Sequence, residues 1–159
     1  MPDPSHILNW RRLDEKITTS GQLSESQLAE VRKLGVTHVI NLGPHTHEQA
    51  LPNEADIVQA LGMEYIHIPV DFERPTETEL SCFRAAIVEL KDELVHVHCI
   101  YNARVTAFIY RLRTEVAGID ERSARDFMES VWRPGGVWAL FIGDEERSTL
   151  PHEYAGIDY

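Results

Sequence analysis

The sequence predicts an α/β fold with a central, mainly parallel sheet flanked by helices. Three short runs rich in β-branched and apolar residues alternate with segments of helical pattern: VTHVINL at 36–42, MEYIHIPV at 63–70 and LVHVH at 94–98. Such runs are typical of strands covered on both faces. A helix between consecutive strands acts as a crossover connection, which places the strands parallel.

The pattern predicts a single domain over residues 1–159, with a core at about 15–143 and a polar, loosely held C-terminal tail at 144–159. A chain of this length buries roughly 68–70% of its unfolded surface, which is enough for a stable core. The first 14 residues have no regular pattern, although Trp10 is expected to anchor them.

In the first half of the chain, a short strand is expected at 16–19. A helix then begins after Ser24, whose side chain forms a capping box with Gln27, and it ends before Gly35. The next strand is followed by a loop, and a second helix is expected at 53–61.

In the second half, Thr76 and Glu79 form another capping box, and the helix that they begin runs to about Lys91. The third strand then leads through a polar loop at 99–104 into an amphipathic helix that starts at about Val105.

Beyond this helix the pattern predicts two more helices. Asp120 caps one that reaches about Trp132, the sequence RPGG at 133–136 breaks it, and a short helix follows at 137–142. We expect both helices to pack over the sheet.

Composition narrows the class of protein. Hydrophobic residues make up 43% of the chain and charged residues 26%, as in ordinary globular proteins, and the net charge of −11 argues against nucleic-acid binding. No apolar run approaches the roughly 18 residues of a membrane span, and the N-terminus lacks the apolar segment of a signal peptide. The two cysteines, Cys82 and Cys99, suit a reducing compartment, and Cys82 is expected in the core. We therefore expect a cytoplasmic monomer without nucleic-acid or membrane partners.

The loop at 99–104 is the candidate functional site. Its amides and the first free amides of the following helix point at one spot, where the helix dipole favours an anion. Cys99 lies where this positive end stabilises a thiolate, the nucleophilic form. A cation such as Arg104 in the first turn destabilises the helix by roughly 0.3–1 kcal/mol, because it opposes the dipole, and an oxyanion between them removes this cost. The planar guanidinium of Arg104 also matches two phosphate oxygens. The alternative is an inert, half-buried cysteine and a surface arginine.

The sequence HCIYNAR at 98–104 resembles the active-site loop of cysteine-dependent phosphatases of the protein tyrosine and dual-specificity group, whose signature is His-Cys, five residues and Arg. The resemblance covers about residues 15 to 115. It implies a dual-specificity-phosphatase-like fold and a phosphocysteine intermediate, with no cofactor and no metal. In that scheme Cys99 attacks phosphorus, while Arg104 and the loop amides hold the phosphoryl oxygens.

The loop also departs from the signature. Only four residues separate Cys99 from Arg104, Val105 replaces the usual Ser or Thr, and Asn102 replaces a Gly. Four-residue spacing is the loop length of rhodanese-type sulfurtransferases. The chain looks most like a group of small bacterial phosphatase-like proteins with this shortened loop, some of which are described as sulfurtransferases.

The resemblance assigns substrate binding to the whole loop. His98 is expected to orient it through hydrogen bonds, Asn102 tolerates the left-handed conformation that a tight turn needs, and Tyr101 is expected to be exposed at the pocket mouth. The expected substrate-binding residues are His98, Ile100, Tyr101, Asn102, Ala103 and Arg104.

Asp71 is the candidate general acid, because it follows a strand in a loop 28 residues before Cys99. The resembling phosphatases place their acid in such a loop. Glu73 is the second candidate, and the alternative is that Asp71 only stabilises a turn.

Two His-x-His pairs, His45 with His47 and His96 with His98, leave a metallohydrolase as an alternative. That reading needs a third ligand, for which the sequence offers no clear candidate.

The function expected first is hydrolysis of a phosphate monoester on a protein or small molecule, as in protein tyrosine or dual-specificity phosphatases. The alternatives are sulfur transfer through a Cys99 persulfide and a non-catalytic module that binds a phosphorylated partner. Sulfur transfer requires no proton for an alkoxide leaving group, so it would leave Asp71 without a role.

Overall fold

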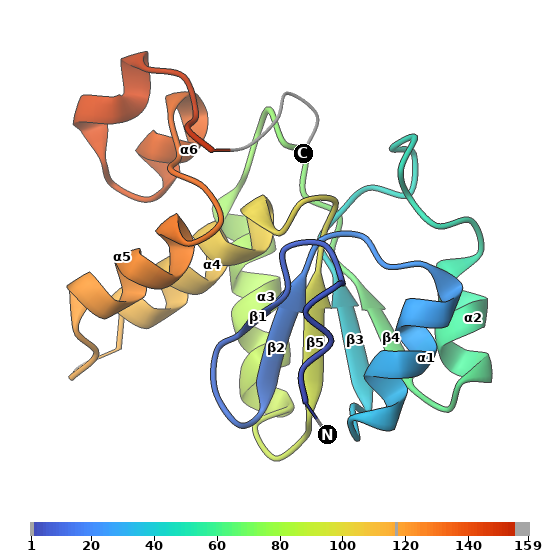
Figure 1. The fold of residues 1–159 in the computed structure, drawn as a ribbon. Helices are drawn as coiled ribbons and strands as arrows, with labels where there is room; N and C mark the ends of the chain where they lie inside the picture. Colours follow the sequence, from blue (N-terminus) through green and yellow to red (C-terminus); the bar gives the residue numbers. More distant parts are fainter. Residues whose placement is uncertain (1, 117, 155–159) are drawn as a thin grey trace.

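The computed structural model describes residues 2–116 and 118–154, and its centre is a five-stranded sheet of order β1-β2-β5-β3-β4 (Figure 1). Strands β2, β5, β3 and β4 are parallel, and β1 pairs antiparallel with β2. The predicted α/β fold with a mainly parallel sheet is confirmed. The strands are β1 (Arg11–Arg12), β2 (Ile17–Ser20), β3 (His38–Asn41), β4 (Glu64–His67) and β5 (Val95–His98).

Strand β1 corrects the expectation that the first 14 residues are irregular. It contains two residues, too few to show the alternation that identifies a strand in a sequence. Its pairing with β2 decides its structure.

Four helices cover the two faces of the sheet (Figure 1). Helices α1 (Glu25–Lys33) and α2 (Glu54–Ala60) lie on one face, and α3 (Glu77–Glu89) and α4 (Ala103–Thr114) lie on the other. Both predicted capping boxes are present, at the starts of α1 and α3. Helix α4 begins two residues before the predicted start, which brings Arg104 into its first turn.

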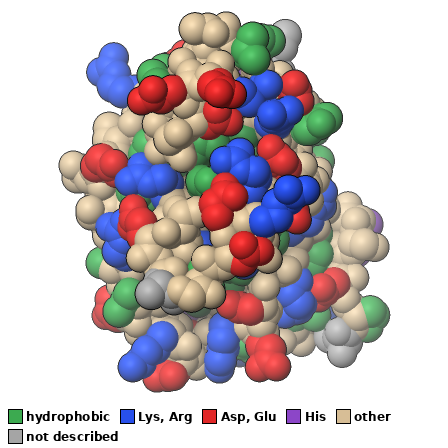
Figure 2. Space-filling model, turned by 90° about the vertical axis from the view of Figure 1, so that its left-hand side faces the viewer, with side chains coloured by type: hydrophobic (Ala, Val, Ile, Leu, Met, Phe, Trp, Pro, Cys, Tyr) green, Lys and Arg blue, Asp and Glu red, His purple; other side chains and the backbone are tan. Residues whose placement is uncertain are grey.

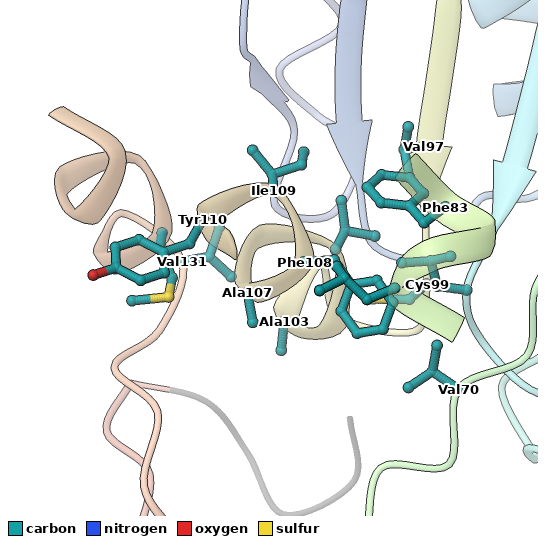
Figure 3. Close-up of a cluster of buried hydrophobic side chains, with 14 of the residues drawn as sticks. Val70, Phe83, Val97, Cys99, Ala103, Ala107, Phe108, Ile109, Tyr110 and Val131 are labelled. Atoms are coloured by element: carbon teal, nitrogen blue, oxygen red, sulfur yellow. The ribbon is translucent and has the colours of Figure 1, made fainter. Parts of the chain in front are cut away.

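Neighbouring strand residues belong to two separate cores. Val39 packs with apolar residues of α1 and α2, whereas Ile40 belongs to the cluster of α3 and α4, because successive side chains of a strand point to opposite faces. In the second cluster the rings of Phe83 and Phe108 lie 5.9 Å apart, and Cys99 lies in the same cluster (Figure 3).

His96 lies on the α1 face of β5 and is fully buried. Ser20 Oγ donates to the Gly21 carbonyl, so it accepts from His96 Nε2, and Thr18 Oγ1 is left to donate to His96 Nδ1, each bond at 2.8 Å. Burial, and then the nearby charge of His98, hold the pKa of His96 well below its ordinary value. His96 is therefore neutral in the folded protein.

The free energy of unfolding is expected to fall as the pH drops below about 6.5, the ordinary pKa of histidine. Below that pH the unfolded chain binds a proton at position 96 that the folded chain does not, with a slope of up to about 1.4 kcal/mol per pH unit. Urea denaturation over this pH range measures the slope. His96→Gln is expected to reduce this slope, and an unchanged slope in that variant would contradict the assignment.

The last helices pack against α4, which corrects the expectation that they cover the sheet. Helix α5 (Glu121–Glu129) lies beside α4 in Figure 1. Helix α6 (Gly136–Phe141) contacts α4 through Phe141, whose ring centre lies 5.3 Å from that of Phe108, and the 3₁₀ turn η1 (Glu145–Thr149) packs on α6. Every residue of α4 from Ala103 to Tyr110 is buried, because the helix packs on the sheet with one side and on α5 with the other. A helix that is buried on both sides shows no single apolar stripe, so its sequence pattern does not indicate that α5 packs on the side away from the sheet.

The described part of the tail is held in place, contrary to the expectation for residues 144–159. Arg147 is buried, and its guanidinium donates to the carbonyls of Pro134 and Pro151. Arg133 and Glu153 form a backbone bridge. The sequence does not reveal this pairing, because the partners of Arg147 are backbone carbonyls. Every residue has a carbonyl, so none stands out as a partner in the sequence. Residues 155–159 of the predicted tail lie outside the described residues.

Cys82 is exposed on α3, which corrects the prediction that it lies in the core. Its helix turns this position to solvent while Leu80 and Phe83 are buried.

On the face shown in Figure 2, Lys and Arg side chains lie among Asp and Glu, and on α5 they form i,i+4 pairs such as Arg125 with Glu121. Within residues 2–116 and 118–154, no helix has the length and apolar character needed to cross a membrane.

Candidate active site

The candidate site lies at the carboxyl ends of the parallel strands, where ligands bind in open α/β sheets. The loops that follow β3, β4 and β5 meet there, and backbone hydrogen bonds fix their spacing. Leu42 N donates to the His98 carbonyl at 2.8 Å, and Val70 N donates to the Leu42 carbonyl at 2.9 Å. The backbone of Leu42 is thus hydrogen-bonded both to the residue before Cys99 and to the residue before Asp71, and it links the two loops.

The turn of the 99–104 loop is made by Asn102, which has a φ of 74° and a ψ of 7°. This left-handed conformation is the one that the sequence predicted for an Asn in place of Gly. The side chain also donates to the Asn9 carbonyl and to Thr19 Oγ1, both at 2.9 Å. Asn102 therefore tolerates the turn and also ties it to the N-terminal segment, which a glycine could not do.

Two loop carbonyls are bound from the N-terminal side of the molecule. Asn9 Nδ2 donates to the Tyr101 carbonyl at 2.9 Å, and the amide of Gln22 donates to the Ile100 carbonyl at 3.0 Å. Because the N–H and C=O of a trans peptide point in opposite directions, the amides of Tyr101 and Asn102 are turned away from these anchors. Asn9 and Gln22 carried no signal in the sequence, since each lies far along the chain from the loop.

Arg104 is a buried cation with unsatisfied donors. The residue is 2% exposed, and its Nε and Nη1 have no hydrogen-bond partner among the described residues. Its guanidinium lies 5.0 Å from the centre of the Phe72 ring, a cation–π contact. Burial lowers the pKa of Arg104, while Cys99 and Asp71 act in the opposite direction, so both side chains lie near it. Donors held this way favour an anionic ligand with several oxygens.

A pocket of about 490 Å³ opens onto Arg104. It brings Arg104 and the predicted acid Asp71 together, whereas Glu73 and Tyr101 are not among its described lining residues. Tyr101 is half-buried against the core, not exposed as expected. The lining residues are Pro44, Thr46, Pro69, Val70, Asp71, Phe72, Glu79 and Arg104.

Asp71 is exposed, and its Oδ1 accepts a hydrogen bond from the amide of Glu73 at 2.9 Å. The carboxylate therefore stabilises its own turn and also lies at the pocket. The charge of Glu73 acts on His152, whose pKa it raises against the larger lowering effect of burial. Asp71 lines the pocket with Arg104 and acts on its pKa, whereas Glu73 is not among the described lining residues.

The C-terminal helices hold the loop that carries Asp71. Trp138 Nε1 donates to the Phe72 carbonyl at 2.7 Å. The Phe72 ring packs against Trp132 and Trp138, with ring centres 5.8 and 5.5 Å away. The sequence showed two tryptophans in this region but nothing to indicate that they reach the acid loop.

His98 makes two contacts with its ring. Its Nδ1 lies 3.1 Å from the Cys99 carbonyl, and its Nε2 lies 2.7 Å from Glu54 Oε2. Both side chains are buried, and Gln22 Nε2 donates to the other carboxylate oxygen of Glu54. Glu54 is a site residue that sequence reasoning missed, because 44 residues separate it from His98.

The two His-x-His pairs have separate surroundings. His45 stacks on His67 with ring centres 3.7 Å apart, while His96 is hydrogen-bonded to hydroxyls of β2. Within the described part of the chain, no three His, Cys, Asp or Glu side chains are grouped as metal ligands would be.

A second hollow, of about 440 Å³, lies between α3 and α4 and the start of β2. Its described lining is mostly apolar and includes Phe83, Ile87 and Leu112, without Cys or His. We place the candidate site at the pocket beside Arg104, because Arg104 and Asp71 line it and Cys99 lies close to the Arg104 guanidinium. Cys99 itself is buried and is not among the described lining residues.

A comparison with protein families finds that residues 9–111 match the family described as "Beta-lactamase hydrolase-like protein, phosphatase-like domain". This range contains residue 71 and the 99–104 loop. Beta-lactamase hydrolase-like proteins from two strains of Xylella fastidiosa, Temecula1 and 9a5c, are each 30% identical to the chain over 127 residues. The match covers 78% of this chain but only 28% of each relative, so the chain spans little more than a quarter of their length.

Solved structures show the same fold. A DUF442 protein from Shewanella putrefaciens CN-32, provisionally described as a phosphatase, is 29% identical, with a TM-score of 0.70 over 77% of this chain and 79% of that one. The active form of Tk-PTP is 22% identical, with a TM-score of 0.68 over 89% and 97% of the two chains. A variant of Pseudomonas aeruginosa TpbA in complex with pTyr is 20% identical, with a TM-score of 0.63 over 94% and 82%.

Proposed function

Since this chain belongs to the phosphatase-like domain family of beta-lactamase hydrolase-like proteins, we propose that it hydrolyses phosphate monoesters through a phosphocysteine intermediate. The observation that carries the proposal is the state of Arg104. Arg104 is 2% exposed, and two of its guanidinium donors have no partner among residues 2–116 and 118–154. Such a cation is costly to bury alone, and a phosphoryl group would supply both the charge and the oxygens.

In the first step, the Arg104 guanidinium and the amides at the start of α4 hold the phosphoryl oxygens. The Cys99 thiolate attacks phosphorus, so that an S–P bond forms and the ester P–O bond breaks. Asp71 gives its proton to the leaving oxygen, which departs as an alcohol or phenol. Positive groups around the phosphoryl oxygens stabilise the charge that develops there.

In the second step, water attacks the phosphocysteine while Asp71 takes a proton from it. The S–P bond breaks, inorganic phosphate leaves, and the thiolate is restored. His98 keeps the loop oriented in both steps, because its ring is hydrogen-bonded to the Cys99 carbonyl.

The proposed substrates are phosphorylated tyrosine, serine or threonine side chains or small phosphate esters. Two observations support an aromatic ester. The pocket walls next to Arg104 include Phe72 and two prolines, and the similarly folded TpbA has been crystallised with pTyr.

Sulfur transfer remains the second candidate, because four residues between Cys99 and Arg104 match the rhodanese loop length. In that reaction Cys99 would accept a sulfur atom and carry it as a persulfide. Asp71 at the pocket favours the phosphatase, since only ester cleavage needs a proton donor for the leaving oxygen.

Paired assays on one preparation distinguish the two reactions. We expect release of nitrophenol from nitrophenyl phosphate in the presence of EDTA, and inhibition of this release by vanadate. With thiosulfate and cyanide we expect no thiocyanate. Thiocyanate formation together with a Cys99 persulfide in the mass spectrum would establish sulfur transfer instead. Binding of a phosphopeptide without turnover in either assay would indicate a non-catalytic module.

A further inference from the structure

Glu54, the first residue of α2, contacts His98, which directly precedes Cys99. Its carboxylate lies 2.7 Å from His98 Nε2, and the two side chains are 1% and 0% exposed. Gln22 Nε2 donates to the remaining carboxylate oxygen, also at 2.7 Å. Buried ion pairs seldom stabilise a fold more than apolar residues of the same size would. The pair therefore has a better explanation in the loop that it contacts than in the stability of the protein.

The contacts of His98 determine its protonation. Both ring nitrogens face groups that accept hydrogen bonds: the Glu54 carboxylate and the Cys99 carbonyl. Burial alone would raise the pKa of Glu54, but the charge and hydrogen bond of His98, and then the hydrogen bond of Gln22, hold it below its ordinary value. Glu54 is therefore ionised. A neutral imidazole has a single N–H, so both contacts are hydrogen bonds only when each ring nitrogen carries a proton.

The other titratable groups that face this pair are neutral near pH 7. Burial lowers the pKa of His96 and of His67, and burial raises the pKa of Tyr65. The His98 ring and the Arg104 guanidinium are thus the two groups near Cys99 that can carry a positive charge.

We propose that Glu54 is a positioning residue, which holds His98 as an imidazolium with its Nδ1–H on the Cys99 carbonyl and thereby favours the Cys99 thiolate. The positive charge then lies on the residue next to Cys99, in contact with the Cys99 carbonyl. Glu54 itself touches no substrate. Its role rests on the proposed nucleophile, but the state of the thiol can be measured without any substrate.

The test is the pH dependence of Cys99 alkylation by iodoacetamide. In a Cys82→Ser background Cys99 is the single thiol, because the chain has two cysteines. Glu54→Gln keeps the shape and removes the charge, and the alkylation midpoint is expected to move up by about 1 pH unit. Asp56→Asn is the matched control, since it removes an exposed carboxylate from the same turn of α2. Its midpoint is expected to equal that of the background protein.

A double-mutant cycle with His98→Asn separates the proposed role from a general loss of structure. His98→Asn is expected to raise the midpoint as well, and Glu54→Gln is expected to add nothing further in that variant, because the imidazolium is already gone. Additive shifts would overturn the proposal, as would a correctly folded Glu54→Gln protein with an unchanged midpoint.

Two further measurements keep the proposal testable. Gln22→Met removes one donor to Glu54 but keeps the carboxylate, so the alkylation midpoint is expected to rise by less than in Glu54→Gln. If Glu54→Gln does not fold, Gln22→Met and His98→Asn serve as the test. Unchanged midpoints in both of these variants would overturn the proposal. In turnover, kcat of Glu54→Gln should fall at mildly acidic pH and recover as the pH rises. If the unmodified protein hydrolyses no phosphate ester, the proposed function fails while the alkylation shift still tests Glu54.

Discussion

Replacement of Cys99 by Ser is expected to abolish hydrolysis of nitrophenyl phosphate, with a loss on the order of 10⁴-fold or more, as when the nucleophile of a covalent mechanism is removed. A serine hydroxyl is not ionised at neutral pH and has no base beside it in the loop, so the S–P intermediate has no counterpart. The measurement is kcat/KM together with a circular dichroism spectrum, which should show an intact fold. Normal turnover by Cys99→Ser would exclude the mechanism.

Cys82 provides the matched control for this experiment. It is the other cysteine of the chain and is exposed on α3, so Cys82→Ser is expected to keep full activity. At about pH 6, iodoacetamide should modify Cys99 before Cys82 even though Cys99 is buried, since the thiolate is the reactive form. Labelling of Cys82 first, with activity retained, would show that Cys99 is an inert core cysteine.

Asp71→Asn is expected to lower kcat by 10²–10⁴-fold, the range typical for the loss of a general acid. The amide keeps the size of the carboxyl group but has no proton to transfer to the leaving oxygen. The loss should be larger for alkyl phosphates than for aryl phosphates, because a phenolate leaves more readily without a proton. Rates for nitrophenyl phosphate and for an alkyl phosphate, measured on one preparation, give the two values.

Glu73→Gln is the control for Asp71, because it neutralises a carboxylate two residues away that lies near His152. We expect little change in kcat for either ester. An equal and small loss for both esters in Asp71→Asn, with a large loss in Glu73→Gln, would transfer the acid role to Glu73.

The sequence by itself determined the elements whose signals are local. Capping boxes at Ser24 and Thr76 depend on side chains three residues apart, so they are visible in the sequence and present in the structure. The three buried runs became parallel strands, because their composition and spacing allow few other arrangements. The motif from His98 to Arg104 likewise identified the candidate loop, since a strand, a tight turn and a helix start lie within consecutive residues.

Only the tertiary structure decided which distant residues meet this loop. Glu54 and Gln22 come from other connections of the sheet. Glu54 contacts His98 and Gln22 binds Glu54 because of the crossover topology, which no periodic pattern records. The tail shows the same limit: Arg147 looked like part of a solvated polar segment until the carbonyls of Pro134 and Pro151 enclosed it. Side-chain spacing in a sequence specifies helices, strands and caps, because these form between near neighbours. Contacts between segments depend on how the chain crosses the sheet, so burial of a charge and the identity of its partner become known only in the folded molecule.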